Sequence, residues 1–376
     1  QKVSFLHEPD STAFTRALNK RIKAYFSTKG ISRNANTAMY IKSAVAVLWF
    51  MLSYALIMMN QWSNLVLVLL FVLHGFGQLY IAFNISHDAN HGAYSSNRRV
   101  NQILSYTFDL VGVNSYMWRL MHNDSHHFHV NIQETDVAIA SNGIFRFSPE
   151  TKWRPHHRYQ HFYAPFIYCL ATLEWVFLKD FNWFFFKKNI GNAISVKHPL
   201  REKVILFATK AFYYGYTLVL PIMVLDNPWY VIVMGFVAFH FGIGFSIALI
   251  FQTTHVVEGT VYPKTDLNGR IHNNYISHLV QTTADYSWRN PVANWFFGCL
   301  NVHTVHHIYP GICHVHYPKL TPILIETAKE FGFEYRENST VWQAFGSHLK
   351  MLKKLGKEAQ FVTDLPMPEM MSQAEA

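Results

Sequence analysis

Four long apolar runs, separated by polar segments, dominate the hydropathy pattern of the chain. An α-helix needs about 20 predominantly apolar residues to cross the hydrocarbon core of a bilayer. The first two runs are joined by the uncharged link 60–64, and the last two turn at 226–228, where asparagine and proline end one helix and begin the next. We therefore expect an all-α integral membrane protein with four transmembrane helices in two hairpins, at residues 40 to about 59, 65 to about 83, about 204 to 225, and 229 to 251.

The placement of lysine and arginine predicts the orientation of these helices. Neither hairpin link carries either residue, whereas the N-terminal arm, residues 85–203 and the region after residue 252 hold nearly all of them. Cytoplasmic loops of membrane proteins carry an excess of these two residues. We therefore expect a multi-pass protein, in a bacterial inner membrane, with both termini in the cytosol.

The segments outside the four runs predict a cap and two terminal extensions. Residues 102–118 and 161–186 are apolar but interrupted, and the second stretch is rich in aromatic residues, which is typical of helices in the membrane interface. We expect a cytosolic arm over residues 1–39, a membrane domain with a cytosolic cap over residues 40–355, and a disordered tail over residues 356–376.

Composition favours a membrane protein over a soluble one. Of the 376 residues, 50% are hydrophobic and 16% aromatic, and only 15% are charged. The net charge of +9 is spread over segments that flank the apolar runs, so a membrane surface is a better partner than nucleic acid. The three cysteines Cys169, Cys299 and Cys313 have no metal-binding spacing, and we expect reduced thiols.

Histidine is the residue type that indicates a chemical function, because many of the 22 histidines fall in clusters on the predicted cytosolic side. The first cluster holds an i, i+4 pair, a spacing that puts two imidazoles on one helical face and lets both reach one metal. The second and third clusters repeat the pair and add an adjacent histidine, which can turn toward a neighbouring ion. Eight imidazoles exceed what a four-coordinate zinc needs, so we predict two metal ions with open positions. Their predicted ligands are His87, His91, His122, His126, His127, His303, His306 and His307.

Further polar residues are expected around these clusters. His255 follows the fourth apolar run at the depth of the clusters and is predicted to be a ninth ligand. The carboxylates of Asp88, Glu258 and Asp285 are expected to accept the second ring N–H of ligating histidines. His129, two residues beyond the second cluster, would have to point back toward the metals to take part. Imidazole suits zinc, copper and iron, so ligand type alone does not choose the metal.

With these clusters the chain resembles the membrane fatty acid desaturases, especially the bacterial linoleoyl-CoA-desaturase-like and front-end group. The resemblance extends from about Tyr40 to Leu355. It differs from the group at the third cluster, where His303 and Val305 replace the usual glutamine and glutamate, and at Asp285, where asparagine is common. The motifs that carry the resemblance lie at residues 87–91, 122–127, 153–161, 255–258, 306–310 and 313–318.

The resemblance implies a helical fold with two histidine-bound irons and a reaction in which dioxygen removes hydrogens from a long acyl chain. The chain could be linked to CoA, to a carrier protein or to a lipid. Relatives often carry a fused haem domain with a His-Pro-Gly-Gly motif, which this sequence does not contain, so we expect a separate ferredoxin or cytochrome b5 as electron donor. Zinc can occupy such a site after purification, because it binds nitrogen ligands more tightly than ferrous iron does.

Other functions remain open at this point. The same iron pair can serve an acyl-chain hydroxylase, an acetylenase or an oxidative decarboxylase. A histidine-rich metal transporter is a non-enzyme alternative, but transporters place ligands within their spans near the middle of the membrane. Arg119, Arg154 and Arg158 are predicted to lie near the mouth of an acyl-chain tunnel, where they would attract an anionic head group.

Overall fold

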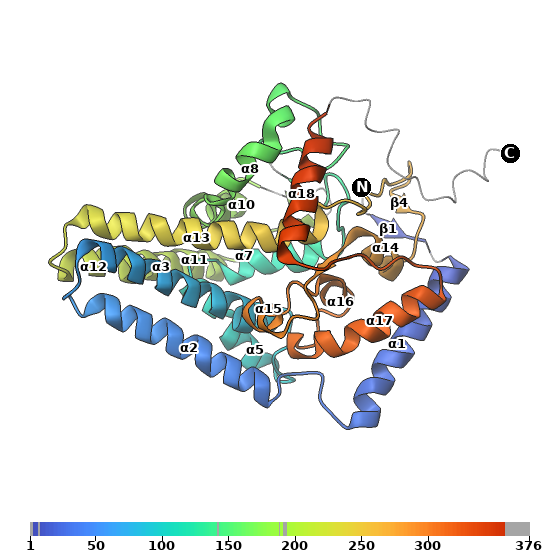
Figure 1. Ribbon diagram of the computed structural model, residues 1–376, viewed down its shortest axis with the longest axis horizontal. Coiled ribbons are helices and arrows are strands. Elements are labelled where there is room, and N and C mark those ends of the chain that lie inside the picture. The colour runs from blue at the N-terminus through green and yellow to red at the C-terminus, as the bar shows by residue number, and fades with distance from the viewer. Residues whose placement is uncertain (1–2, 7, 141–142, 188, 191–193, 358–376) are drawn as a thin grey trace.

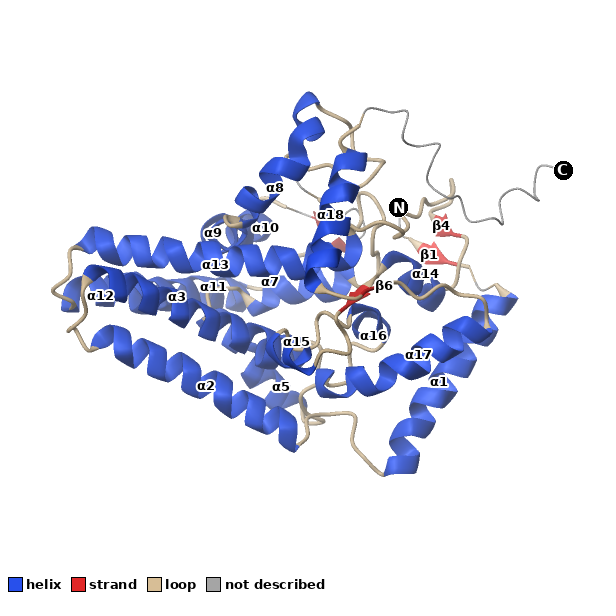
Figure 2. Ribbon diagram, viewed as in Figure 1, coloured by secondary structure: helices blue, strands red, loops and turns tan. Residues whose placement is uncertain are grey.

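The computed structural model is mostly helical and describes residues 3–6, 8–140, 143–187, 189–190 and 194–357 (Figures 1 and 2). Most of the predicted C-terminal tail lies outside these residues. Four helices are long and apolar enough to cross a membrane, as the hydropathy pattern predicts. They are α2 (Thr37–Met58), the continuous run of α3 (Asn64–Ile81), η1 (Ala82–Ser86) and α4 (His87–Asn90), the run of α11 (Leu200–Tyr214), η5 (Gly215–Val219) and α12 (Leu220–Val224), and α13 (Trp229–His255).

Two of these helices extend further than the sequence predicts, and both extensions carry histidines. The second runs on to Asn90, through one turn of π-helix, and the fourth ends at His255. The two helices pack closely side by side (Figure 1). Gly75 and Gly235 permit the close approach, because a Cβ at either position would stand 2.7 Å from a phenylalanine of the other helix. The first histidine cluster and His255 are therefore the ends of two packed helices.

The links between the spans lie together at the end of the molecule far from the histidines. Asn60 accepts a hydrogen bond from the backbone N–H of Asp226 at 2.8 Å and donates one to its carboxylate at 3.0 Å. Ser63 caps α3 by accepting from the N–H of Val66. Side chains of the links 60–64 and 226–228 thus hold the two links to each other.

Short helices between the second and third spans surround the histidines. The stretches 102–118 and 161–186, predicted to be interfacial helices, are broken into several such pieces, and the axes of the second stretch bend by 69° between Tyr168 and Ala171. The pieces are α5 (Arg98–Ser105), α6 (Thr107–Leu110), α7 (Ser115–Arg119), η2 (Leu120–His126), η3 (Pro155–Tyr159), α8 (Gln160–Tyr168), α9 (Ala171–Glu174), η4 (Trp175–Lys179) and α10 (Asp180–Phe185).

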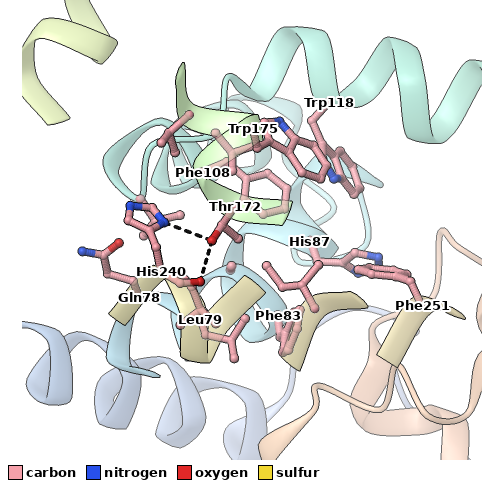
Figure 3. Close-up of a pocket in the computed structure, with 16 residues that line it drawn as sticks. Gln78, Leu79, Phe83, His87, Phe108, Trp118, Thr172, Trp175, His240 and Phe251 are labelled. Atoms are coloured by element: carbon pink, nitrogen blue, oxygen red, sulfur yellow. Dashed lines mark hydrogen bonds between the residues drawn. The ribbon is translucent and has the colours of Figure 1, made fainter. Parts of the chain in front are cut away.

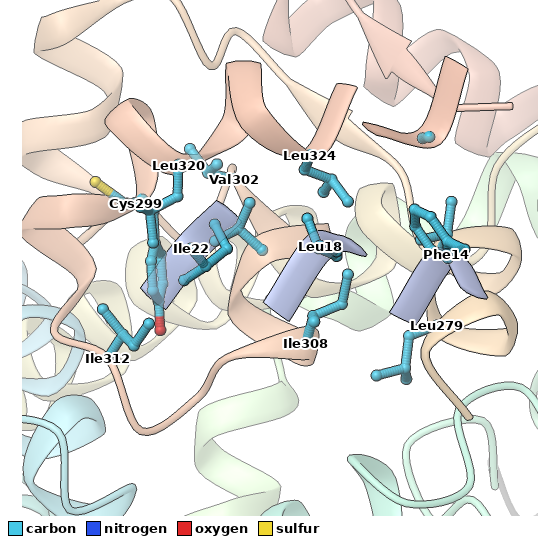
Figure 4. Close-up of a cluster of buried hydrophobic side chains, with 14 of the residues drawn as sticks. Phe14, Leu18, Ile22, Leu279, Cys299, Val302, Ile308, Ile312, Leu320 and Leu324 are labelled. Atoms are coloured by element: carbon cyan, nitrogen blue, oxygen red, sulfur yellow. The ribbon is translucent and has the colours of Figure 1, made fainter. Parts of the chain in front are cut away.

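The N-terminal helix α1 (Pro9–Lys29) packs along α17 (Figure 1). Its buried face, with Phe14, Leu18 and Ile22, joins an apolar cluster that also contains Ile308 and Leu324 (Figure 4). The other elements after the fourth span are α14 (Tyr275–Thr282), α15 (Pro291–Phe296), α16 (His303–Ile308), η6 (His314–His316), α17 (Tyr317–Glu330) and α18 (Val341–Leu355). Three two-residue strand pairs complete the fold: β1 (Ser4–Phe5) with β4 (Arg270–Ile271), β2 (Asn189–Ile190) with β3 (Ile194–Ser195), and β5 (Asp285–Tyr286) with β6 (Glu337–Asn338).

Candidate metal centre

The nine histidines predicted as ligands lie together at one end of the long helices, in two groups of four with one histidine between them. In each group the ligand nitrogens lie within 4.8 Å of one another. Site A is formed by His87, His91, His122 and His306, and site B by His126, His255, His303 and His307. His127 lies between the sites: its Nε2 is 3.1 Å from that of His122, and its ring stacks on that of His307.

Site B has the spacing of a tetrahedral metal site. The Nε2 atom of His255 lies 3.2 Å from that of His126, 2.8 Å from that of His303 and 3.2 Å from that of His307. The Nε2 atoms of His303 and His307 are 3.0 Å apart. Nitrogens bound tetrahedrally at about 2.0–2.1 Å from one ion stand about 3.3 Å from each other. A single ring nitrogen carries one hydrogen or one lone pair, so hydrogen bonds cannot account for three such neighbours.

The other ring nitrogens of site B show which atoms face the centre. The Nδ1 atom of His255 lies 3.2 Å from the carbonyl of Thr282, and that of His303 lies 2.9 Å from the carbonyl of Leu300. The Nδ1 atom of His126 lies 3.0 Å from the carboxylate of Asp136. These acceptors require N–H at Nδ1, so each neutral ring presents an Nε2 lone pair to the centre. Three converging lone pairs repel one another unless a cation lies between them.

Site A leaves buried nitrogens without hydrogen-bond partners among the described residues. These are both ring nitrogens of His87 and the Nε2 atoms of His91 and His306. An unpaired buried polar group costs about 1–3 kcal/mol, which a bound ion would remove. Burial lowers the pKa of His91, His122 and His306 well below its usual value. The neutral imidazole is the form that binds metal, so the donor set and its protonation fit transition metals such as iron and zinc.

The second histidine cluster does not follow the i, i+4 pairing that the sequence predicts. His122 and His126, an i, i+4 pair, belong to different sites. The cause is the π-helix η2, in which the N–H of His127 bonds to the carbonyl of His122. The i→i+5 hydrogen bonds of a π-helix change the angle between successive side chains compared with an α-helix. Single π-helical turns are frequent at functional sites. The i, i+4 pairs of the first and third clusters each stay within one site, and His306, adjacent to His307, belongs to the neighbouring site.

The carboxylates predicted beside the ligands have different positions. Asp285 is buried and accepts from the N–H of Thr304 at 2.7 Å and from its hydroxyl at 2.8 Å, so it holds the first turn of α16 and not an imidazole. Burial raises the pKa of Asp285 to about 6. Glu258 is exposed and pairs with Lys354 at 2.9 Å, so the expectation that it orients a ligating histidine is wrong. Another carboxylate, that of Asp136, lies 3.0 Å from Nδ1 of the ligand candidate His126.

His129 belongs to neither group of ligand nitrogens, and its Nδ1 lies 2.9 Å from the carbonyl of Ser125. The structure also shows the positions of the three arginines that were predicted to lie near a tunnel mouth. Arg119 donates to the side chain of Asn90 at 3.0 Å, one residue before His91. Arg154 and Arg158 are exposed on the segment that leads into α8. Among the described residues, none of the three lines the apolar cavity beside the histidines.

That cavity is lined by the two packed long helices together with residues of α6, α7, α9 and η4, and it ends at His87 (Figure 3). Aromatic rings form much of its wall, including Trp118, Trp175 and Phe251. Its opposite end is polar: the Nδ1 of His240 lies 3.0 Å from the hydroxyl of Thr172. His240 and Phe251 lie on one helix and stand roughly 16 Å apart along its axis. The cavity thus extends from site A into the region between the spans.

Asp88 links site A to a lysine in the first span. It accepts from His314 Nδ1 at 2.9 Å, and its other oxygen lies 3.7 Å from Nδ1 of the ligand candidate His87. The Nε2 atom of His314 lies 2.8 Å from the ammonium of Lys42, which is 2% exposed. Lys42, His314 and Asp88 therefore form a buried, charge-balanced chain that holds the end of the second long helix against η6.

Replacing Lys42 with methionine should weaken metal binding at site A by about tenfold, because loss of outer partners costs about 10–100-fold. The variant leaves Asp88 without its counter-charge. The control is Lys210→Met, which removes another buried lysine, paired with Asp180 at 2.8 Å. Both variants should lower the melting temperature, since breaking a buried ion pair costs about 3–5 kcal/mol. Metal titration that found equal affinities in the two variants would contradict a role for Lys42 at site A.

Comparison with known proteins gives one consistent result. The family model for fatty acid desaturase matches residues 60–339, which include all nine histidines. The chain is 34% identical over 345 residues to the sn-1 linoleoyl-lipid 6-desaturase of Arthrospira platensis, covering 92% of this chain and 93% of the relative. It is 35% identical over 346 residues to the enzyme of the same name from Synechocystis sp., covering 92% and 96%. It is 32% identical over 357 residues to the acyl-lipid (8-3)-desaturase of Physcomitrium patens, covering 93% and 73%.

Proposed function

The chain belongs to the fatty acid desaturase family and is an oxidoreductase, and from that premise we propose that it introduces a double bond into the long acyl chain of a lipid at two irons held in sites A and B. The observation that carries the proposal is the convergence of eight imidazoles as two interleaved groups of four at the end of a cavity with apolar walls. The printed names of the relatives favour an acyl-lipid over an acyl-CoA or an acyl-carrier protein as substrate.

The iron pair would supply the activation of dioxygen that removes hydrogen from an unactivated methylene group. The residues of this chain would hold the substrate and exclude water. The rings of Trp118 and Phe251 would fix the acyl chain beside His87, so that only a short segment of it meets the sites. Asp136 would keep His126 in the tautomer that presents Nε2 to site B.

The setting of the reaction is part of the same proposal. The four candidate spans would cross the membrane as two hairpins, with the short helices in the interface and both termini and both sites in the cytosol. Residues 40–355 would form the membrane domain. Electrons would come from a separate ferredoxin or cytochrome b5. Zinc would be able to occupy the sites of a purified sample and would leave them inactive.

The test is expression of the chain in cells together with a ferredoxin and its reductase, followed by mass spectrometry of total fatty acids. Desaturation predicts an acyl product that lacks two hydrogens and is absent from cells that express His126→Ala or His307→Ala. A product that gains oxygen would indicate an acyl-chain hydroxylase on the same sites. A profile that does not depend on either histidine would contradict the proposal.

A further inference from the structure

A hollow at the surface is lined in part by the residues that directly follow the third histidine cluster. It is bounded by the C-terminal half of α1 and by the segment 308–312, which follows His307 in the chain. Ile308 and Ile312 contribute an apolar floor, and Lys23 and Arg33 contribute exposed cations. No carboxylate is among the lining side chains, in the part of the chain that the structure describes. The hollow therefore combines an apolar base with a positive rim.

The exposed side of α1 extends this positive rim. Its buried side is fixed in the apolar cluster of Figure 4, so the side that carries Arg16, Lys20 and Lys23 faces outward, and Lys29 is exposed at the end of the helix. None of these four has a carboxylate partner within the described residues, whereas Arg21 on the same helix pairs with Glu330. The outward cations cover roughly 20 Å of helix, which is the scale of a contact between two proteins and larger than a single head group.

Two hydrogen-bonded stretches, connected through the covalent bonds of Tyr309, join the hollow to site A. His306 Nδ1 lies 3.4 Å from the hydroxyl of Tyr317, and this hydroxyl donates to the carbonyl of Tyr309 at 3.4 Å. The hydroxyl of Tyr309 in turn donates to Asn19 at 2.8 Å, and Asn19 lines the hollow. In this arrangement His306 uses Nδ1 for this route and keeps Nε2 for site A. The route from the protein surface to a ligand candidate thus passes through only three side chains.

We propose that the outward face of α1 and the hollow beside it, from Asn19 to Arg33 and 308–312, form the docking surface for an acidic one-electron carrier protein. The inference rests on the proposed desaturase function. Each double bond takes two hydrogens from the acyl chain, and dioxygen becomes two waters by taking those hydrogens together with two protons and two electrons. The carrier must therefore dock twice per turnover and be oxidised each time, at a place where a buried centre comes close to the surface.

An anionic membrane surface is the competing occupant, since it would also attract the cations of α1. Two observations favour the protein. The apolar floor suits the desolvated centre of a protein interface with charges at its rim. The hydrogen-bonded route leads from that floor to His306, which electron delivery uses and lipid binding does not.

The experiment measures binding of an acidic [2Fe–2S] ferredoxin to the full chain in a bilayer nanodisc, without acyl substrate. The variant is Lys20→Glu with Lys23→Glu, and the matched control is Lys353→Glu with Lys357→Glu, which makes the same charge change on exposed lysines at and beyond the end of α18. At low ionic strength the first variant should raise Kd by about tenfold or more, and high salt should shrink the difference. Reduction of the iron-loaded protein by ferredoxin should slow, while reduction by dithionite should not change.

An unchanged Kd, or an equal rise in Kd in the control, would overturn the docking surface. So would a variant that binds phosphatidylserine vesicles less tightly but ferredoxin as before, because that result would assign α1 to the membrane. The same measurements distinguish a failure of the docking surface from a failure of the proposed desaturase function. A chain that binds ferredoxin through α1 but desaturates nothing refutes the function, and one that desaturates with unchanged binding in the variant refutes the docking surface.

Discussion

Replacing His255 with alanine should abolish desaturation and empty site B. The Nε2 of His255 is within 3.2 Å of three other ligand nitrogens, so its loss opens the centre of the group. Loss even of outer partners costs about 10–100-fold in metal affinity or activity, and we expect an effect greater than about 100-fold for an inner ligand. The measurement is product formation in cells together with the iron content of the purified protein, which should fall by about one ion per chain.

The matched control is His272→Ala, because the side chain of His272 is 63% exposed and lies 3.4 Å from the carboxylate of Asp266. It should keep both the product and the iron. His255 is informative because it lies outside the three histidine clusters, at the end of a helix whose other residues are mostly apolar. A variant without His255 that retains full iron and activity would show that site B does not need a fourth imidazole from this helix.

Replacing Ile243 with tryptophan should block long acyl chains while sparing both metal sites. Ile243 is 6% exposed and lines the cavity one turn from its polar end at His240, far along the helix from Phe251 and site A. Added bulk there shortens the cavity, so products from long chains should fall by more than about tenfold and those from shorter chains should fall less. Overpacking also costs about 1–3 kcal/mol of stability, which thermal unfolding would report.

The control for bulk is Ile222→Trp, on α12, where the side chain is 40% exposed and does not line the cavity. It should leave the product profile unchanged. Iron content is the second readout, and it should be normal in both variants. A loss of product that is equal for all chain lengths would contradict the placement of the acyl chain between the two long helices.

The spans and the ligand candidates could be predicted because each depends on a local pattern. Twenty apolar residues predict a span wherever they occur, and an i, i+4 pair such as His303 and His307 is set by the pitch of one helix. The distribution of the ligands over two sites depends on long-range packing. Adjacent positions such as His306 and His307 point about 100° apart on a helix, and only the packing against His87 and His255 decides which site each one joins.

The partners of the ligands were harder to predict because they come from irregular backbone and distant segments. Asp136 reaches His126 through a turn in which Asn131 has a φ of 58°, a backbone conformation that the sequence does not predict. Lys42 and His314 are separated by most of the chain and meet only after the first span packs against η6. Glu258 comes only three residues after the ligand candidate His255 in the sequence. It lies beyond the end of α13, however, and faces solvent.

The central claim is that the interleaved histidine groups hold iron and that this iron removes two hydrogens from an acyl-lipid. The most direct test loads one preparation of the protein with iron and a matched preparation with zinc, and supplies both with acyl-lipid, dioxygen, ferredoxin and reductase. Mass spectrometry should find an acyl product lacking two hydrogens only with the iron-loaded protein, with two irons bound per chain. The same product from the zinc-loaded protein, or none from a chain that binds both irons, would contradict the account.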